Sequence, residues 1–155
     1  MRFRMTGLDP APFKTLYGLP DLELARLGVR RYVADRSPGF PDRVELRDAA
    51  PGESLLLLNY VHQPARNAYR GSHAIFVREG AQHRYDRIDE IPQLLRSRPL
   101  SLRAFDAQDM LVDARLLPGT ELEGPIEEFL GDPRVEYVHI HYATRGCYAA
   151  RIDRA

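Results

Sequence analysis

The sequence predicts a single α+β domain, residues 1–155, in which a mainly antiparallel sheet carries a few short peripheral helices. Three observations predict this class. Aliphatic runs and period-two alternation recur in segments of strand length. Helical patterns are few and short, and no long βαβ spacing separates the strand patterns. A chain of 155 residues also has the length of one domain and can bury its own core.

The N-terminal third contains short elements separated by proline and glycine turns. A helix is predicted at Pro20–Leu27, because proline occupies its first turn, acidic residues follow near its positive end, and Gly28 ends it. A helical turn at Phe13–Tyr17 likewise stops at a glycine. Short strands are predicted between these turns, at Arg2–Thr6, Val29–Ala34 and Arg43–Leu46.

The strongest strand patterns lie in the middle of the chain. Aliphatic runs predict buried strands at Ser54–Val61 and His73–Glu79, joined by a polar loop, Gln63–Ser72. Alternation predicts a strand at Leu100–Phe105, and Asp109–Leu117 fits a strand slightly better than a helix. Short helices are predicted on either side of these two segments, at Glu90–Arg96 and Pro125–Leu130.

The last two predicted strands, Val135–Tyr142 and Cys147–Asp153, form a hairpin. A three-residue loop, Thr144–Gly146, suits a glycine in the left-handed conformation at its end. The resulting register pairs His141 with Ala149, Ile140 with Ala150 and His139 with Arg151. Alternation then gives an apolar face of Val138, Ile140, Tyr142, Tyr148, Ala150 and Ile152. The opposite face carries Tyr137, His139, His141, Ala143, Cys147, Ala149 and Arg151.

Composition and charge exclude several classes of protein. The formal net charge is zero, which counts against a nucleic-acid binder. The N-terminus has no apolar signal region, and the longest aliphatic run, Leu55–Leu58, is too short to span a bilayer. The single cysteine, Cys147, excludes an internal disulfide and fits a reducing compartment. The sequence therefore predicts a soluble cytoplasmic protein that binds neither nucleic acid nor membrane.

Histidine and arginine gather in two segments that the predicted sheet can bring together. The polar loop and its flanks offer candidate ligand-binding residues, which are Asn59, His62, Gln63, Arg66, Tyr69 and Arg70, with Arg151 from the hairpin. Candidate catalytic residues are His73, His139, His141 and Cys147. If the segments converge, His62 or His73 should lie within about 10 Å of His139 or His141.

The same segments carry a resemblance. The stretch from Leu56 to Pro64, then Tyr69-Arg70 and His73–Val77, is similar to a bacterial family of unknown function, domain-of-unknown-function family twelve-oh-three. So is the ending Val138–His141 with Gly146-Cys147 and Arg151–Arg154. The resemblance covers most of the chain, from Gly7 onward. It implies a small bacterial stand-alone protein, and it brings no activity, ligand or catalytic residue.

Four interpretations of the polar face stay open, and the sequence does not decide whether the protein is an enzyme. The leading one is a pocket for a small anionic molecule, with Arg70 and Arg151 as the clamp and His73, His139 or His141 handling protons. A second is a divalent metal held by His139 and His141, with His62, His73 or Cys147 as a third ligand. A third is a nucleophilic thiol at Cys147 beside His141. The last is a structural or interaction protein whose polar face is solvated or contacts a second subunit of a homo-oligomer.

Overall fold

The computed structural model describes the whole chain, residues 1–155, and confirms the predicted α+β class. The strands are β1 (Phe3–Thr6), β2 (Arg30–Val33), β3 (Ser54–Gln63), β4 (Gly71–Arg78), β5 (Asp86–Ile88), β6 (Pro99–Phe105), β7 (Leu111–Pro118), β8 (Tyr137–Tyr142) and β9 (Tyr148–Arg154). The helices are α1 (Ala11–Lys14), α2 (Asp21–Arg26), α3 (Gln93–Arg96), the 3-10 turn η1 (Gly119–Glu121) and α4 (Glu123–Gly131). Every pairing between these strands is antiparallel. None of the helices has the length and apolarity needed to cross a membrane.

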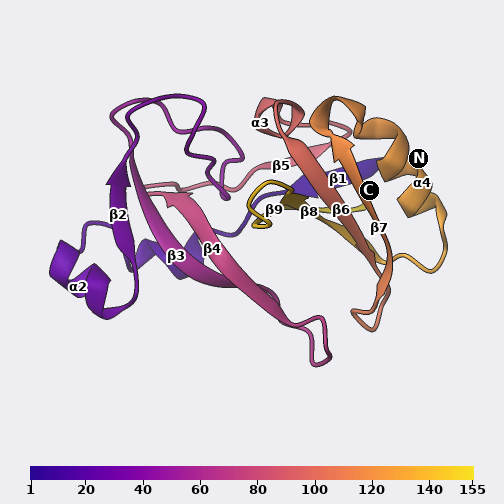
Figure 1. Cartoon of the computed structure of the whole chain (residues 1–155), viewed down its shortest axis with the longest axis horizontal. Helices are drawn as coiled ribbons and strands as arrows, with labels where there is room; N and C mark the ends of the chain where they lie inside the picture. Colours follow the sequence, from indigo (N-terminus) through magenta and orange to yellow (C-terminus); the bar gives the residue numbers. More distant parts are fainter.

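The strands form two sheets rather than one (Figure 1). Six strands pair in the order β5-β1-β9-β8-β6-β7, and three pair in the order β2-β3-β4. The smaller sheet lies on the left of Figure 1 with α2 at its outer edge. The prediction of one sheet is therefore wrong, because β3 and β4 belong to the smaller sheet and β6, β8 and β9 to the larger. An aliphatic run shows that a strand is buried, but it does not specify the strand with which it pairs.

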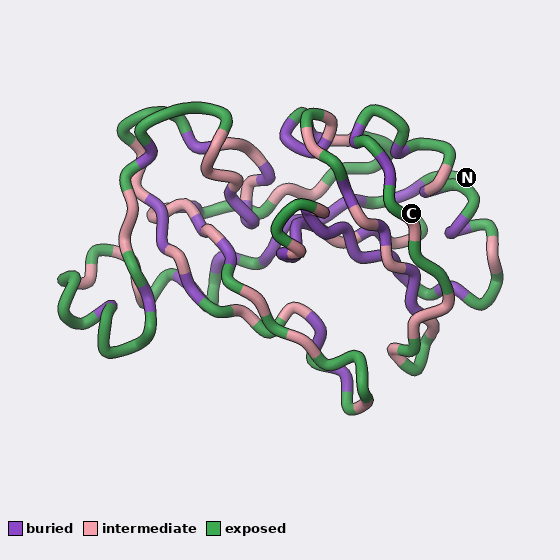
Figure 2. Tube along the Cα trace, viewed as in Figure 1, coloured by how far each residue is buried: buried purple, intermediate pink, exposed green.

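Each sheet packs one face against its own apolar cluster. The larger cluster, of 21 buried residues, lies between the six-stranded sheet and the helices α3 and α4. The smaller, of 11 residues, joins β3 and β4 to α1 and α2, and it includes Tyr148 of β9. The sheets therefore meet at β9, and all six residues of β8 beside it are buried (Figure 2). The assignment of the chain to one domain stays a prediction.

Several element boundaries differ from those predicted. Residues 43–46 form a turn rather than a strand, and Leu46 has a positive φ of 51°. β5 escapes prediction because its three residues carry no apolar pattern. The predicted helices at Glu90–Arg96 and Pro125–Leu130 begin at Gln93 and at Glu123. The ambiguous segment after Phe105 is the strand β7.

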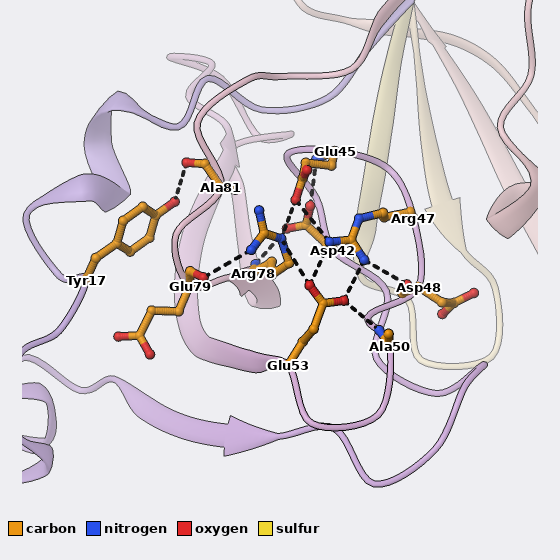
Figure 3. A network of polar contacts seen from close by, with 10 residues as sticks. All are labelled: Tyr17, Asp42, Glu45, Arg47, Asp48, Ala50, Glu53, Arg78, Glu79 and Ala81. Atoms are coloured by element: carbon orange, nitrogen blue, oxygen red, sulfur yellow. Dashed lines mark hydrogen bonds and ion pairs between the residues drawn. The ribbon is translucent and has the colours of Figure 1, made fainter.

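The long connection between β2 and β3, residues 34–53, is held by a network of charged groups (Figure 3). At its centre, the fully buried Asp42 accepts the backbone N–H of Arg78 at 2.7 Å and that of Glu45 at 2.6 Å. Around it, Arg47 donates to Glu53 at 2.6 and 2.8 Å, and Glu53 also accepts the N–H of Ala50. Burial raises the pKa of Asp42, while these N–H donors oppose the rise. The segment is therefore an ordered part of the structure, fixed against β4.

Replacing Asp42 by alanine is expected to lower the free energy of unfolding by roughly 2–4 kcal/mol, because two partly buried N–H groups lose their acceptor. Urea unfolding measures this change. Asp42→Asn should lose less, since its amide oxygen can still accept one of the two bonds. An exposed carboxylate of the same segment supplies the control, and Asp35→Ala should change the stability by less than about 0.5 kcal/mol. Equal effects at both positions would contradict the assigned network.

Candidate functional site

The hairpin of β8 and β9 places the histidines of the candidate site. Ile140 pairs with Ala150 and His139 with Arg151, as predicted. The register then shifts, so that His141 pairs with Tyr148 rather than with Ala149. Tyr142 exchanges backbone hydrogen bonds with the turn, since its N–H bonds to the carbonyl of Cys147 and its carbonyl accepts the N–H of Gly146. The loop therefore spans residues 143–146, and the extra residue in β9 forms a β-bulge.

Because of the bulge, three side chains of the hairpin lie on the face opposite to the one predicted. Tyr148, predicted on the apolar face, lies on the histidine face, with its ring 5.1 Å from that of His139 and 5.9 Å from that of His141. Cys147 and Ala149, predicted beside the histidines, belong instead to the larger apolar cluster. Cys147 accepts a hydrogen bond from Arg43 at 3.0 Å. The predicted pairing of a thiol with His141 on one face is therefore wrong.

Three imidazoles converge where the two sheets meet. His62 of β3 places its ring centroid 4.9 Å from that of His141 and 6.4 Å from that of His139. The rings of His139 and His141 are also 6.4 Å apart, and Tyr148 stacks on His62 at 5.6 Å. The predicted proximity of the polar loop to the hairpin is thus confirmed through His62. We call His62, His139 and His141 the histidine triad.

The end of the β3–β4 hairpin is fixed over the six-stranded sheet by polar contacts. Gln63, 3% exposed, donates to the hydroxyl of Tyr137 at 2.8 Å, and that hydroxyl donates to Asp109 at 2.6 Å. The side chain of Asn67 donates to the carbonyls of Gln108 and Asp109, each at 3.1 Å. The tips of the β3–β4 and β6–β7 hairpins accordingly lie at the same end of the molecule (Figure 1). These bonds keep His62 facing His139 and His141.

Arg103 of β6 completes the site and was not among the predicted residues. It pairs directly with His139, so both side chains project from the same face of the sheet. Its guanidinium has one long hydrogen bond, 3.4 Å from Nε to the hydroxyl of Ser101, and no carboxylate partner. Burial alone lowers the pKa of Arg103. The alternation within Leu100–Phe105 could have indicated it, because that pattern puts Arg103 on the polar face.

The triad and Arg103 line a recess of about 210 Å³ between the end of the β3–β4 hairpin and the strands β6, β7 and β8. Its other lining residues are Gln63, Tyr69, Phe105, Leu111 and Ala114. Burial lowers the pKa of both His139 and His141 to about 3, and Arg103 contributes to both shifts. Burial, followed by the charge of Arg103, also lowers the pKa of His62. The triad is therefore neutral at pH 7.

Hydrogen bonding fixes the tautomer of His141. Its Nδ1 lies 2.9 Å from the carbonyl oxygen of Gly146, which can only accept, so Nδ1 carries the proton. In the neutral ring Nε2 is then a free acceptor. The Nδ1 atoms of His62 and His139 are enclosed and have no hydrogen-bond partner. The recess thus offers a guanidinium donor beside an imidazole acceptor, an arrangement that suits an anion bearing a proton.

The remaining predicted site residues lie outside this recess. Asn59, Arg66 and Arg70 are exposed, and Arg70 donates to the carbonyl of Pro64. Arg151 is engaged by Asp153, with contacts of 2.7–3.0 Å, and lies over the ring of Tyr137. His73 borders a different cleft. No group of three or more histidine, cysteine, aspartate or glutamate side chains is arranged to hold a metal ion, so the geometry gives the metal interpretation no support.

Comparison with known proteins bears on the family and not on the activity. Residues 39–154, three quarters of the chain, match the family described as "Protein of unknown function (DUF1203)". This range contains the triad, Arg103 and both hairpins. Neither the curated proteins nor the solved structures gave a match. The chain belongs to the DUF1203 family, as the resemblance of its histidine-containing segments indicated.

Proposed function

We propose that the protein binds a small anionic molecule, of the size of a phosphate or a short carboxylate, in the recess formed by the histidine triad and Arg103. The observation that carries this proposal is the guanidinium of Arg103, which is half-buried and has no carboxylate partner. Other half-buried arginines of the chain have one, such as Arg31 with Glu79 and Arg98 with Asp48. A partly desolvated cation without a counterion favours an anion from solution.

The size and polarity of the recess support the same class of ligand. A volume of about 210 Å³ lies below the range usual for drug-sized ligands, which begins at about 300 Å³. The neutral triad adds no positive charge, so Arg103 would hold the anion. Nε2 of His141 would accept a proton from the ligand, in hydrogen bonding or in an acid–base step. Arg103 thus replaces Arg70 and Arg151 as the clamp in this proposal.

The compartment and partners belong to the proposal as well. The free, buried Cys147 is suited to a reducing cytoplasm. Zero net charge favours a small-molecule ligand over nucleic acid.

Isothermal titration with inorganic phosphate at constant ionic strength tests the binding function. Wild-type protein is expected to bind one phosphate, and Arg103→Gln should bind it roughly 10- to 100-fold more weakly, since a charge-assisted hydrogen bond contributes about 1.5–3 kcal/mol. Acetate and sulfate, titrated in the same way, define the preferred anion. Arg70→Gln is the matched control, because its exposed side chain lies outside the recess, and it should bind as the wild type does.

A second measurement separates the geometry of the site from its function. Because the charge of Arg103 lowers the pKa of His62, Arg103→Gln should raise that pKa in an NMR titration without any ligand. If the pKa rises but no anion binds to the wild type, the arrangement is correct and the proposed function is wrong. If Arg103→Gln binds phosphate as tightly as the wild type, the proposal is also wrong, since another group holds the ion.

A further inference from the structure

A second and larger cavity lies on the other side of the β8–β9 hairpin. Its volume is about 810 Å³, within the range of roughly 300–1,000 Å³ typical of sites for organic ligands. It is bordered by the smaller sheet, by residues 35–43 of the long connection and by the turn after Tyr142. The hairpin separates it from the histidine recess. His141 of β8 lines the recess, whereas the next residue, Tyr142, faces the opposite side and lines this cavity. We call it the large cleft.

One wall of the large cleft is aromatic. Tyr32 and Phe76 project from the sheet face opposite the smaller apolar cluster, and their rings meet edge to face at 5.5 Å. Phe40 from the long connection packs against Phe76 at 5.4 Å. All three rings are half-buried, so part of each is open to the cleft. Such a wall suits the flat face of an aromatic ligand.

Arginine is the most frequent charged residue among those that line the large cleft. Four arginines line it, whereas Asp35 is the only carboxylate among the lining residues. Arg43 is 2% exposed and has no carboxylate partner, since it donates to two carbonyls and to the sulfur of Cys147. Arg145 on the turn is exposed and makes no ion pair. Arg98, which is bound to Asp48, and Arg36 are the other two.

An unpartnered polar group lies between the two innermost guanidiniums. The ring of Tyr142 has Arg43 at 5.0 Å and Arg98 at 5.3 Å. The residue lines the cleft and is 95% buried. Its hydroxyl is enclosed and has no hydrogen-bond partner. Buried hydroxyls normally have a partner, so this enclosed hydroxyl is an unsatisfied polar group beside Arg43 and Arg98. The unsatisfied hydroxyl is independent of the charge excess and adds to the polar character of this part of the cleft lining.

From these features we infer that the large cleft is a second binding site, which takes an organic anion with a flat aromatic body. The ring of the ligand lies against Phe40, Phe76 and Tyr32. Its carboxylate, sulfonate or phosphate group lies toward Arg43 and Arg145, on the side of the cleft lined by Tyr142. The site does not depend on the function proposed for the histidine recess, because no residue lines both cavities.

Calorimetric titration with naphthalene-2-sulfonate tests the inference. The wild type is expected to bind one molecule saturably, while methanesulfonate, which lacks the ring, and 2-naphthalenemethanol, which lacks the charge, bind at least about tenfold more weakly. Ala74 is an exposed residue of β4 that lines the cleft, so it can carry a new charge without disturbing the core. Ala74→Glu should weaken binding roughly tenfold by repulsion, whereas the uncharged Ala74→Gln should stay within about threefold of wild type.

Three further variants complete the test. Arg145→Glu and Arg145→Gln repeat the charge comparison on the exposed turn, in case the variants at Ala74 fold poorly. Arg103→Gln, in the other cavity, should bind naphthalene-2-sulfonate as the wild type does. The inference is overturned if the wild type does not bind this ligand, if the glutamate and glutamine variants bind alike, or if Arg103→Gln abolishes binding.

Discussion

Lowering the pH from 7 to 5 is expected to destabilise the folded protein by about 4 kcal/mol, because two buried histidines resist protonation. His139 and His141 are 4% and 1% exposed, and burial lowers the pKa of each from 6.5 to about 3. Between these values the unfolded chain binds protons that the folded chain does not. The stabilising contribution is therefore complete above about pH 6.5 and is lost as the pH falls toward 3.

The loss of stability caused by the buried histidines occurs at a higher pH than the loss caused by the paired glutamates. The carboxylates of Glu53 and Glu79 have pKa values lowered to about 2, chiefly by hydrogen bonds from Arg47 and Arg31, so their stabilising contributions disappear only below about pH 4.5. Urea unfolding at half-unit steps between pH 7.5 and 5 therefore separates the histidine effect from that of these two glutamates. The slope should approach about 3 kcal/mol per pH unit for two histidines, since each contributes at most about 1.4 kcal/mol per unit.

A matched pair of variants identifies the groups that titrate. His139→Phe puts an apolar ring among the aromatic neighbours of His139 and should roughly halve the pH slope. His83→Gln removes an exposed histidine and should leave the slope unchanged. A stability that stays constant between pH 7 and 5 in the wild type would show that the triad is protonated or solvated in the folded protein.

Replacing Arg43 by alanine is expected to cost roughly 3–5 kcal/mol of stability, because two carbonyls lose a charged donor and each such hydrogen bond contributes about 1.5–3 kcal/mol. Its Nε donates to the carbonyl of Tyr148 at 2.8 Å and its Nη1 to that of Pro41 at 2.5 Å. Its own backbone N–H bonds to the carbonyl of Phe76 at 3.2 Å. One residue thus ties the long connection to β4 and to β9, so its loss weakens the junction of the two sheets.

Thermal and urea unfolding of three variants measure this contribution. Arg43→Lys keeps the positive charge but lacks the planar guanidinium with its several donors. An intermediate loss of stability is therefore expected. Arg36→Ala, on the exposed part of the same connection, should change the stability by less than about 0.5 kcal/mol, because its ion pair with Asp35 is on the surface. A loss below about 1 kcal/mol for Arg43→Ala would mean that the guanidinium is not needed to join the sheets.

The sequence predicts the strands of this fold better than their partners. The aliphatic runs that became β3 and β4 mark burial correctly, and glycines and prolines mark most turns. Which strands pair depends on contacts between distant residues, such as Arg43 with Tyr148, and no local pattern encodes these contacts. Residues 43–46 alternate between polar and apolar side chains, so the sequence predicts a strand there. In the structure the carboxylate of Asp42 accepts the backbone N–H of Glu45, and this bond stabilises a turn instead.

Only part of the candidate site is predictable from the sequence, because part of it also depends on contacts between distant residues. Histidines on one face of a strand can be recognised from alternation, so His139 and His141 were expected side by side. The bulge near Ala149 could not be foreseen, because an extra residue in one strand leaves no compositional trace, and it moves Tyr148 to the triad and Cys147 away from it. Arg103 becomes significant only when its lack of a carboxylate is visible in three dimensions.

The hairpin of β8 and β9 also limits how this chain can vary in length. His141 and Tyr148 line or border the recess on one side, whereas Tyr142 and Cys147 line the cleft on the other. Adding or removing a single residue within the paired parts of these strands would turn the following side chains to the opposite side, unless a bulge such as the one at Ala149 absorbs the change. A paired change of two residues in the turn 143–146 would preserve both sides. Length variation among proteins built on this hairpin should therefore occur in this turn or at the bulge, and not elsewhere in the paired strands.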